Sequence, residues 1–335
     1  MESKKTFIIA ELSANHNNDF DLAVKTIEAV AKTGADAIKI QTYTADSLAL
    51  DVDNEFFGPK KEGLWKGWRP YDLYTEASTP YDWQPKLKKI AEDLGLVFFS
   101  TPFDKEGVDF LEEMGNPIYK IASFEINDIP LIKYAASKGK PMIISTGVGD
   151  EEDIRLALNA CLEVGNDDIT LLKCTSQYPA PLEMANLQTI PDMKRRFKLK
   201  IGVSDHTLGH MVPVVAVALG ATVVEKHFIL DRSLGGADST FSMEPEEFKT
   251  MVDEIRKVEL TLGEVKYDIN DSDKLKRRSL FTVSDIKKGE IINETNIRSL
   301  RPGHGLHPKY YNEIIGKKLL VNLPKGSPLK LEYFE

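Results

Sequence analysis

Short apolar runs alternate with amphipathic stretches along most of the first 265 residues. The apolar runs are rich in β-branched residues, a pattern typical of buried strands. We expect strands at residues 6–12, 37–42, 97–101, 118–123, 142–147, 169–175, 200–205 and 222–228. Between them, apolar positions recur at helical spacing, and several of these stretches end at Gly, a common residue after a helix. We expect helices at residues 21–34, 83–95, 105–115, 129–139, 151–165, 186–197, 212–220 and 245–263.

The alternation predicts the fold class. Near-continuous apolar strands, each followed by a helix, indicate a parallel sheet covered by helices. Eight such pairs within about 260 residues favour a (β/α)8 barrel over an open doubly wound sheet. The first strand is not followed by the GxGxxG motif of dinucleotide-binding folds, which also weakens the open-sheet alternative.

The pattern breaks after residue 265. We assign residues 1–265 to the barrel, residues 266–278 to a charged linker, and residues 279–335 to a small β-rich module with Gly turns. A module of this size has little core of its own, so we expect it to pack on a partner. Its "RPGHGLHP" loop offers Arg301, His304 and His307, either as solvated turn residues or as ligand contacts.

Composition narrows the class of partners and the location. The 335 residues carry a net charge of −9, which argues against nucleic acid and anionic membrane as partners. No apolar run approaches the length of a bilayer span, and the N-terminus lacks a secretory signal. We therefore expect a cytoplasmic protein whose two cysteines, Cys161 and Cys174, are reduced core residues.

Polar residues gather where the predicted strands end. Active sites of (β/α)8 barrels lie on the face formed by the C-terminal ends of the strands, so these residues are the candidates for chemistry. In chain order they are Glu11, Lys39, Gln41, Thr101, Lys120, Ser123, Glu125, Ser145, Ser176, Tyr178, Ser204, His206, His227 and Asp238. Lys173 and Lys226 have the opposite strand parity, and we leave them out of the site.

His206 and His227 end two strands that are neighbours in a barrel. Histidines at strand ends are often only local hydrogen-bonding caps. Because these two can approach each other, we favour the alternative that they share a divalent metal.

Two lysines and several hydroxyls of the set suit an anion. Lys39 and Lys120 would bind phosphate or carboxylate oxygens through charge-assisted hydrogen bonds, together with the hydroxyls of Thr101, Ser123, Ser145 and Ser204. A barrel lysine can instead form a Schiff base, as in aldolases. Glu11 and Glu125 are the acid–base candidates, although strand-end carboxylates often only cap helices.

A set of motifs resembles the sialic acid synthase family. They are "AELSANHN", "GADAIKIQTY", "FSTPFD", "YKIAS", "STG", "KCTSQYPAP", "GVSDHTLG", "EKHF" and "RPGHG", and together they span nearly the whole chain. The blocks "GLWKGWRPYDLYTEASTPYDW", "KIASFE" and "HFILDRSLGGADSTFS" resemble more closely the pseudaminic acid branch of that family.

The resemblance implies a barrel joined to an antifreeze-like (SAF) domain, and a condensation reaction. Phosphoenolpyruvate and the open aldehyde form of an N-acylated amino sugar would give a nonulosonic acid and phosphate. In the pseudaminic acid branch the sugar is 2,4-diacetamido-2,4,6-trideoxy-L-altrose. By motif, His206 and His227 would bind Mn²⁺ or Mg²⁺. Phosphoenolpyruvate would be held by Lys39, Thr101, Lys120, Ser123, Ser145, Ser176 and Ser204.

The resemblance also implies the sugar contacts and the acid–base groups. Glu125, Tyr178, Asp238 and Arg301 would face the sugar, with Arg301 supplied by the partner chain of a domain-swapped homodimer, and Glu11 and Gln41 would complete the site. A metal acting as Lewis acid would activate the aldehyde. The two lysines would hold developing charge, and Glu11 or Glu125 would orient or deprotonate the attacking water.

Other functions stay open at this point. Ser176 replaces an Asn of the acetylneuraminate branch, and the loop after the second strand is built differently, so N-acetylmannosamine is the weaker substrate candidate. The alternative within the family is an N-acetylneuraminate or legionaminate synthase. More remote are a Schiff-base aldolase, a metal-dependent hydrolase, which usually has HxH on its first strand, and a non-catalytic sugar- or ice-binding protein.

Overall fold

Eight parallel strands close into a barrel in the order β1 to β8, with β8 hydrogen-bonded to β1. The computed structural model describes residues 5–335. The strands are β1 (Phe7–Glu11), β2 (Ala37–Thr42), β3 (Val97–Pro102), β4 (Tyr119–Ile121), β5 (Met142–Ser145), β6 (Ile169–Cys174), β7 (Lys200–Asp205) and β8 (Val223–His227). The barrel lies within the first of two compact units, Met1–Gly263, and the predicted (β/α)8 fold is confirmed.

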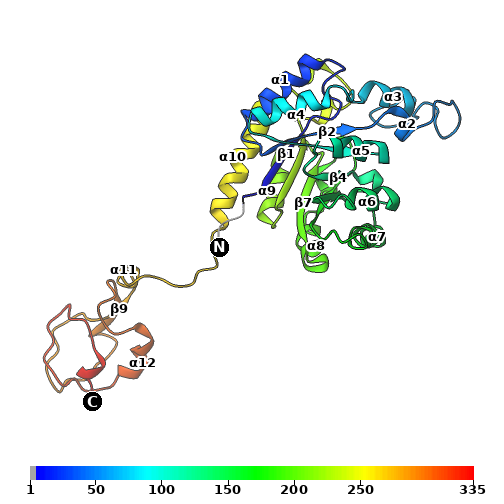
Figure 1. Cartoon of the computed structure of the whole chain (residues 1–335). Coiled ribbons are helices and arrows are strands. Elements are labelled where there is room, and N and C mark those ends of the chain that lie inside the picture. The colour runs from blue at the N-terminus through cyan, green and yellow to red at the C-terminus, as the bar shows by residue number, and fades with distance from the viewer. Residues whose placement is uncertain (1–4) are drawn as a thin grey trace. The chain divides into compact units, whose positions relative to one another are not determined.

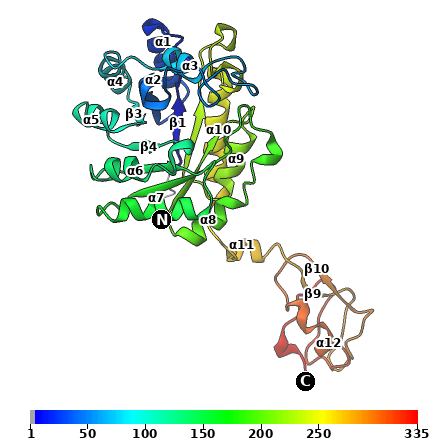
Figure 2. The same ribbon diagram turned by 90° about the vertical axis from the view of Figure 1, so that its right-hand side faces the viewer.

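Helices surround these strands, and neighbouring helices pack on one another, as α10 does on α9 (Figure 1, Figure 2). The α-helices are α1 (Phe20–Ala31), α2 (Ala45–Leu48), α3 (Pro70–Ala77), α4 (Gln84–Asp93), α5 (Lys105–Glu113), α6 (Ile129–Ala136), α7 (Glu151–Leu162), α8 (Thr189–Phe197), α9 (Met211–Ala218) and α10 (Pro245–Leu262). Short 3₁₀ helices are η1 (Ser123–Glu125), η2 (Leu182–Met184), η3 (Arg232–Leu234) and η4 (Ser239–Phe241). No helix within residues 5–335 is both long and apolar enough to cross a membrane.

Local sequence sets the helix ends. Asp19, Asp104 and Asp150 precede α1, α5 and α7, and their carboxylates accept hydrogen bonds from backbone N–H groups of the first turn. Such caps satisfy donors that a helix leaves free at its N-terminus. Gly95, just after α4, has a φ of +83°, a left-handed conformation that favours glycine and ends the helix there.

The barrel interior is filled in layers, as expected for this fold. An apolar layer is formed by Ile9, Ala37, Phe99, Ile143, Leu172 and Val223. At Gly202 of β7 a Cβ atom would come within 2.4 Å of the carbonyl oxygen of Val223, so no side chain fits at this inward position. Because inward side chains recur every second residue, the next inward position on most strands carries the polar residues predicted from the strand ends.

The segment between β2 and α4 is a long insertion on the C-terminal side of the strands. It contains α2, α3 and a loop at residues 60–68 closed by two backbone hydrogen bonds, Lys60 N to the Trp68 carbonyl (2.9 Å) and Gly67 N to the Lys60 carbonyl (2.8 Å). The sequence pattern assigned no element to residues 43–82, and both helices lie within that stretch.

The second compact unit is Glu264–Glu335. It contains α11 (Asp271–Lys274), an antiparallel pair of β9 (Ser279–Thr282) and β10 (Ile297–Leu300), α12 (Tyr311–Ile314), and the 3₁₀ helices η5 (Pro308–Tyr310) and η6 (Leu331–Tyr333). Its own small core includes Leu280, Ile297, Leu319 and Leu329. The helix α11 lies within the stretch that the sequence predicted as a linker.

Candidate active site

A layer of polar side chains lies inside the barrel, above the apolar layer and toward the C-terminal ends of the strands. Glu11, Lys39, Thr101, Lys120, Ser145, Ser204 and Glu225 belong to it, each at most 5% exposed. They come from seven of the eight strands or from residues directly after them. Charged groups this deeply buried are rare unless they are paired.

The charges of this layer are paired in a network. Lys39 contacts the carboxylate of Glu11 and lies 3.7 Å from Oε2 of Glu225. Lys120 donates to Oε1 of Glu225 (2.9 Å), and the Ser204 hydroxyl donates to the same oxygen (2.9 Å). Lys39 also donates to the Thr101 hydroxyl (3.0 Å). The two predicted anion-binding lysines therefore share the two carboxylates of Glu11 and Glu225.

The two carboxylates differ in their pKa values. Burial raises the pKa of Glu11 above its ordinary value, and the nearby charge of Glu225 adds to that effect, although Lys39 opposes it. Burial acts in the same sense on Glu225, but the charges of Lys120 and Lys39 prevail and lower its pKa. Glu225 is thus the firmly ionised partner of both lysines, while Glu11 takes up a proton readily.

The rings of His206 and His227 lie side by side, with centroids 5.3 Å apart. Nδ1 of His206 is 3.0 Å from the Thr175 carbonyl oxygen. Nδ1 of His227 is buried, has no hydrogen-bond partner within residues 5–335, and lies 3.6 Å from Oδ2 of Asp238. Burial, helped by nearby His206, lowers the pKa of His227 well below its usual range, so this imidazole is neutral.

Two imidazoles this close fit a divalent metal, because each has a nitrogen lone pair to donate when it is neutral. Burial acts to lower the pKa of His206, but the Cys174 sulfur beside it prevails and raises that pKa, so His206 would give up its proton when a metal binds. Within the described residues 5–335, no group of three or more His, Cys, Asp or Glu side chains is arranged to hold a metal ion. A metal here would take His206 and His227 as ligands and leave its other positions to water or substrate. Such an open coordination sphere is typical of catalytic rather than structural metal sites.

A cavity of about 480 Å³ opens next to the histidines, and we call it the chamber. Gln41, Glu125, Tyr178, His227 and Asp238, five of the predicted site residues, line it. The other lining residues include Ser13, Tyr43, Lys60, Trp65, Tyr74, Phe103 and Phe124. The chamber has polar groups beside His227 and aromatic walls elsewhere, the usual make-up of a small-molecule site.

Glu125 presents a proton-accepting group to the chamber. It ends the 3₁₀ helix η1, and its Oε2 atom is buried without a hydrogen-bond partner within residues 5–335. Burial raises its pKa to about 7, against the opposing charge of Lys120. A carboxyl group with a pKa near neutrality is suited to general acid–base catalysis.

The remaining predicted residues have the following positions. The Ser123 hydroxyl accepts from the Gly147 backbone (3.1 Å), and Ser145 carries a buried hydroxyl without a partner within residues 5–335. Gln41 donates to the Ser13 hydroxyl (3.0 Å). Ser176 lies 3.8 Å from the Cys174 sulfur. All these residues belong to the first unit, whereas Arg301 is an exposed residue of the second.

Three contributors were missed by the sequence analysis. Glu225 lies two residues before His227 and hence on the same face of β8, a parity signal that was available. Cys174 is buried and free as predicted, but its sulfur lies 3.9 Å from Nδ1 of His206, so it borders the site and not only the core. Trp65 belongs to an irregular loop, and no periodic pattern would have placed it in the chamber wall.

Known proteins resemble this chain along nearly its whole length. The pseudaminic acid synthase of Campylobacter jejuni subsp. jejuni is 47% identical over 335 residues, which cover 99% of this chain and 97% of that protein. The pseudaminic acid synthase of Helicobacter pylori is 45% identical, covering 98% and 97%. The N,N'-diacetyllegionaminic acid synthase of Legionella pneumophila is 38% identical, covering 99% and 96%.

Solved structures and family models agree with these relatives. The crystal structure of an N-acetylneuraminic acid synthetase from Leptospira borgpetersenii, in complex with citrate, matches with a TM-score of 0.72 and 34% identity, covering 81% of this chain and 90% of that one. The SAF domain model matches residues 277–335 and the NeuB family model residues 26–267. From the extent of these matches, the chain belongs to the NeuB family, with a C-terminal SAF domain.

Proposed function

We propose that this chain condenses phosphoenolpyruvate with 2,4-diacetamido-2,4,6-trideoxy-L-altrose and water, giving pseudaminic acid and phosphate. The observation that carries the proposal is the buried layer of two lysines and several hydroxyls directly beside the paired rings of His206 and His227. It provides an anion site next to a metal-compatible site at the C-terminal end of a barrel. The identity of 45–47% to pseudaminic acid synthases supports this choice of sugar.

The polar layer would hold phosphoenolpyruvate. Lys39 and Lys120 would bind its phosphate and carboxylate oxygens, with hydroxyl donors from Thr101, Ser123, Ser145, Ser176 and Ser204. Because Glu225 already balances one positive charge, a proton on Glu11 would leave the layer with a net positive charge. Binding of the anion would therefore favour the protonated form of Glu11.

The sugar would occupy the chamber with its aldehyde toward the histidines. His206 and His227 would hold a Mn²⁺ or Mg²⁺ ion, which when bound would supply Lewis acidity to the aldehyde oxygen. Tyr178, Asp238 and Gln41 line the chamber around that position and would orient the sugar. Its first carbon would then lie next to the methylene carbon of phosphoenolpyruvate, as carbon–carbon bond formation requires.

Water would complete the reaction at the second carbon of phosphoenolpyruvate. Glu125 has a free oxygen in the chamber and a pKa of about 7, so it would take the proton from this water. Glu11 is less free, because one of its oxygens accepts from the Ser13 backbone (3.0 Å) and its carboxylate contacts Lys39. The tetrahedral adduct would expel phosphate by breaking the carbon–oxygen bond, and Lys39 and Lys120 would stabilise the charge on it.

A Schiff-base aldolase fits the site less well. A lysine nucleophile needs a lowered pKa so that its neutral amine is available. Although burial alone would lower the pKa of Lys39, its contacts with Glu11 and Glu225 raise it. Borohydride should therefore not trap a covalent adduct when it is added with phosphoenolpyruvate or the sugar.

We also propose a cytoplasmic homodimer in which the SAF domain of one chain completes the site of the other. Both cysteines are buried free thiols, in keeping with a reducing compartment. Arg301 of the second unit is the residue that would reach the partner's sugar.

The proposal is tested by phosphate release from phosphoenolpyruvate across a panel of amino sugars. Fastest release with the L-altrose sugar is expected. Faster release with N-acetylmannosamine or with the legionaminic acid precursor would assign the chain to the corresponding synthase, and no release with any sugar would contradict the reaction.

The bond that breaks can be followed with heavy oxygen. Phosphoenolpyruvate labelled at the oxygen that bridges carbon and phosphorus should transfer its label to the released phosphate. Label recovered in the sugar acid would mean attack at phosphorus, and would contradict cleavage of the carbon–oxygen bond.

A further inference from the structure

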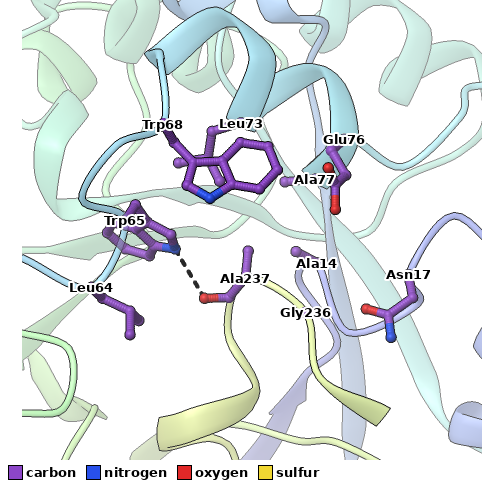
Figure 3. A pocket seen from close by; sticks show the side chains of 10 residues that line it. All are labelled: Ala14, Asn17, Leu64, Trp65, Trp68, Leu73, Glu76, Ala77, Gly236 and Ala237. Carbon is purple, nitrogen blue, oxygen red and sulfur yellow. Dashed lines mark hydrogen bonds between the residues drawn. The ribbon is translucent and has the colours of Figure 1, made fainter. Parts of the chain in front are cut away.

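A second, smaller cavity lies beside the chamber, at the rim of the barrel, and we call it the rim pocket (Figure 3). Its volume is about 280 Å³. Leu64, Trp65, Trp68 and Leu73 of the insertion make its lining largely apolar, and Asn17 and Glu76 lie at its edge. None of these residues was assigned to the site from the sequence, and the proposed mechanism does not use them.

Trp65 lines both cavities, as do Ala14, Leu73, Ala77 and Ala237, so the rim pocket and the chamber adjoin. Its indole N–H donates to the carbonyl oxygen of Ala237, 2.9 Å away, as the dashed line in Figure 3 shows. Its ring lies 5.6 Å from the ring of Tyr178, centroid to centroid. The insertion is thereby tied to the loop that follows β8 and to the chamber itself.

The loop that carries Trp65 is held in place from within. Nζ of Lys60 lies 4.8 Å from the centre of the Trp65 ring, a cation–π distance. The two backbone hydrogen bonds between Lys60 and residues 67–68 close the loop. A rigid aromatic side chain loses little conformational entropy when a ligand binds, so it is well suited to discriminate between ligands.

Two polar side chains, Glu76 and Asn17, lie at the edge of the pocket (Figure 3). Nδ2 of Asn17 donates to the carbonyl oxygens of Leu234 (3.1 Å) and Gly235 (3.3 Å). The side-chain oxygen is left as the acceptor, and it is directed toward Ala14 and Gly236 (Figure 3). A Cβ atom on Gly236 would lie 2.2 Å from this oxygen, so glycine is needed here for the Asn17 side chain to keep its position.

We propose that the rim pocket binds the end of the sugar farthest from the aldehyde, namely the acylamino group at C4 and the terminal methyl group at C6, and that Trp65 determines this specificity. The inference rests on the proposed function, because it takes the aldehyde to lie at His206 and His227. His227 and Trp65 line the same chamber, so an extended sugar with its aldehyde at the histidines would reach past Trp65 into the adjoining rim pocket.

The chemistry of the pocket fits those two groups. The indole rings and leucines suit methyl groups, whereas a hydroxyl placed against them would lose its hydrogen bonds to water. The Asn17 oxygen would accept the N–H of the acylamino group. A sugar with hydroxyls at both positions could still donate to the Asn17 oxygen, but it lacks the acetyl and terminal methyl groups that fill the apolar part of the pocket. Its terminal hydroxyl would be buried against the indole rings, which disfavours the analogue.

The first test compares two sugars in Trp65→Leu, with Trp83→Phe as the control. Trp83 packs on His16 and Phe20, away from both cavities. For Trp65→Leu, the ratio of kcat/KM for the diacetamido trideoxy sugar to kcat/KM for N-acetylmannosamine should fall about 10-fold or more. Loss of an apolar contact typically changes the preference between two substrates by about this factor. The KM for phosphoenolpyruvate should stay within about twofold, since its site is made of other residues.

An equal loss for both sugars, or no loss, would overturn the role of Trp65. The proposed function is judged separately, by which sugar the unmutated protein prefers. If it prefers another diacetamido sugar, the same ratio is measured with that sugar in place of the L-altrose compound.

A second measurement does not depend on Trp65 being replaced. The chain has only three tryptophans, so Trp68→Phe with Trp83→Phe leaves Trp65 as the sole indole emitter. Titration with the diacetamido sugar should shift its fluorescence, and titration with N-acetylmannosamine to saturation should shift it far less. An unchanged emission at sugar concentrations that saturate turnover would contradict the proposal.

Discussion

Nζ of Lys226 lies 2.5 Å from Oδ2 of Asp205, and both side chains are buried on the outer face of the barrel. The same Nζ donates to the carbonyl oxygen of Thr207. Asp205 and Thr207 flank His206, and Lys226 directly precedes His227. The ion pair therefore joins β7 to β8 just where the two histidines turn inward.

We predict that Lys226→Met destabilises the protein by about 3–5 kcal/mol, because it leaves the Asp205 carboxylate buried without its cation. Urea unfolding measures the change. The matched control is Lys249→Met, which breaks an exposed pair with Asp253 on α10 and should cost at most about 1 kcal/mol. Equal stability of the two variants would show that the buried pair contributes no more than the exposed one.

The pH dependence of turnover should follow Glu125. Its pKa of about 7 means that the carboxylate, the form that accepts a proton from water, is lost as the pH falls below 7. We expect kcat/KM to rise with pH up to about 7 and then level off. Glu125→Gln should lose about 10²–10⁴-fold in rate and this rise with it, whereas Glu11→Gln should keep the rise. A pH profile unchanged in Glu125→Gln would remove Glu125 from this role.

Most of the fold was predictable from the sequence, because strands and helices of a barrel leave periodic patterns. Strand parity also placed Lys39, Lys120 and His227 inside the barrel and Lys226 outside it. The same parity places Glu225 inside the barrel, but its role as the shared partner of Lys39 and Lys120 depends on contacts between strands that lie far apart in the sequence.

Other parts of the site left no periodic signal. Trp65 is held in the chamber wall by one side-chain hydrogen bond to the Ala237 carbonyl and by contact of its ring with that of Tyr178. Trp65 and Tyr178 are 113 residues apart in the sequence. The pairing of Lys39 with Glu11 depends on strand register, which places β2 beside β1 with Lys39 opposite Glu11. Long-range contacts of this kind depend on tertiary packing and not on local sequence.

His16 should make stability depend on pH. It follows β1, its Nε2 lies 3.2 Å from the Thr79 hydroxyl, and burial lowers its pKa to about 4. In the unfolded chain its pKa is about 6.5, so between pH 6.5 and 4 the unfolded state binds the additional proton. The stabilisation is complete above pH 6.5 and falls by up to about 3 kcal/mol as the pH drops to 4.

Urea unfolding at pH 7.5 and 5.0 measures this effect. The difference in unfolding free energy between the two pH values should shrink in His16→Gln, which keeps a polar side chain but has no proton to gain. A His16→Gln variant that loses as much stability on acidification as the unmutated protein would assign the acid sensitivity to other groups.

Removal of divalent metal should abolish turnover, and Mn²⁺ or Mg²⁺ should restore it. Calorimetry should show one Mn²⁺ bound per chain, with the affinity lost in His206→Ala and in His227→Ala because each removes one of the two protein ligands. His304→Ala, which changes an exposed histidine of the second unit, is the control. Full turnover by the metal-free protein, or unaltered Mn²⁺ binding by the double histidine variant, would exclude this site.

Arg301 should act on the sugar of the partner chain. It is exposed in a loop that is fixed at Gly303, whose N–H donates to the Leu275 carbonyl (2.8 Å), and at Gly305, whose N–H donates to the Ser279 hydroxyl (2.8 Å). A planar guanidinium on a rigid loop can bind sugar or amide oxygens in a fixed geometry. Arg301→Ala should therefore raise the KM for the sugar more than the KM for phosphoenolpyruvate.

Subunit mixing tests whether Arg301 acts between chains. Arg301→Ala and His206→Ala chains are combined under conditions where subunit exchange is verified by mass spectrometry, and turnover is assayed at a sugar concentration at which neither variant alone is active. In a mixed dimer, the barrel that keeps His206 receives Arg301 from its partner, so random pairing should restore about a quarter of the unmutated activity. If exchange is complete and no activity returns, Arg301 acts within its own chain or has no role in the reaction, and a swapped active site is excluded.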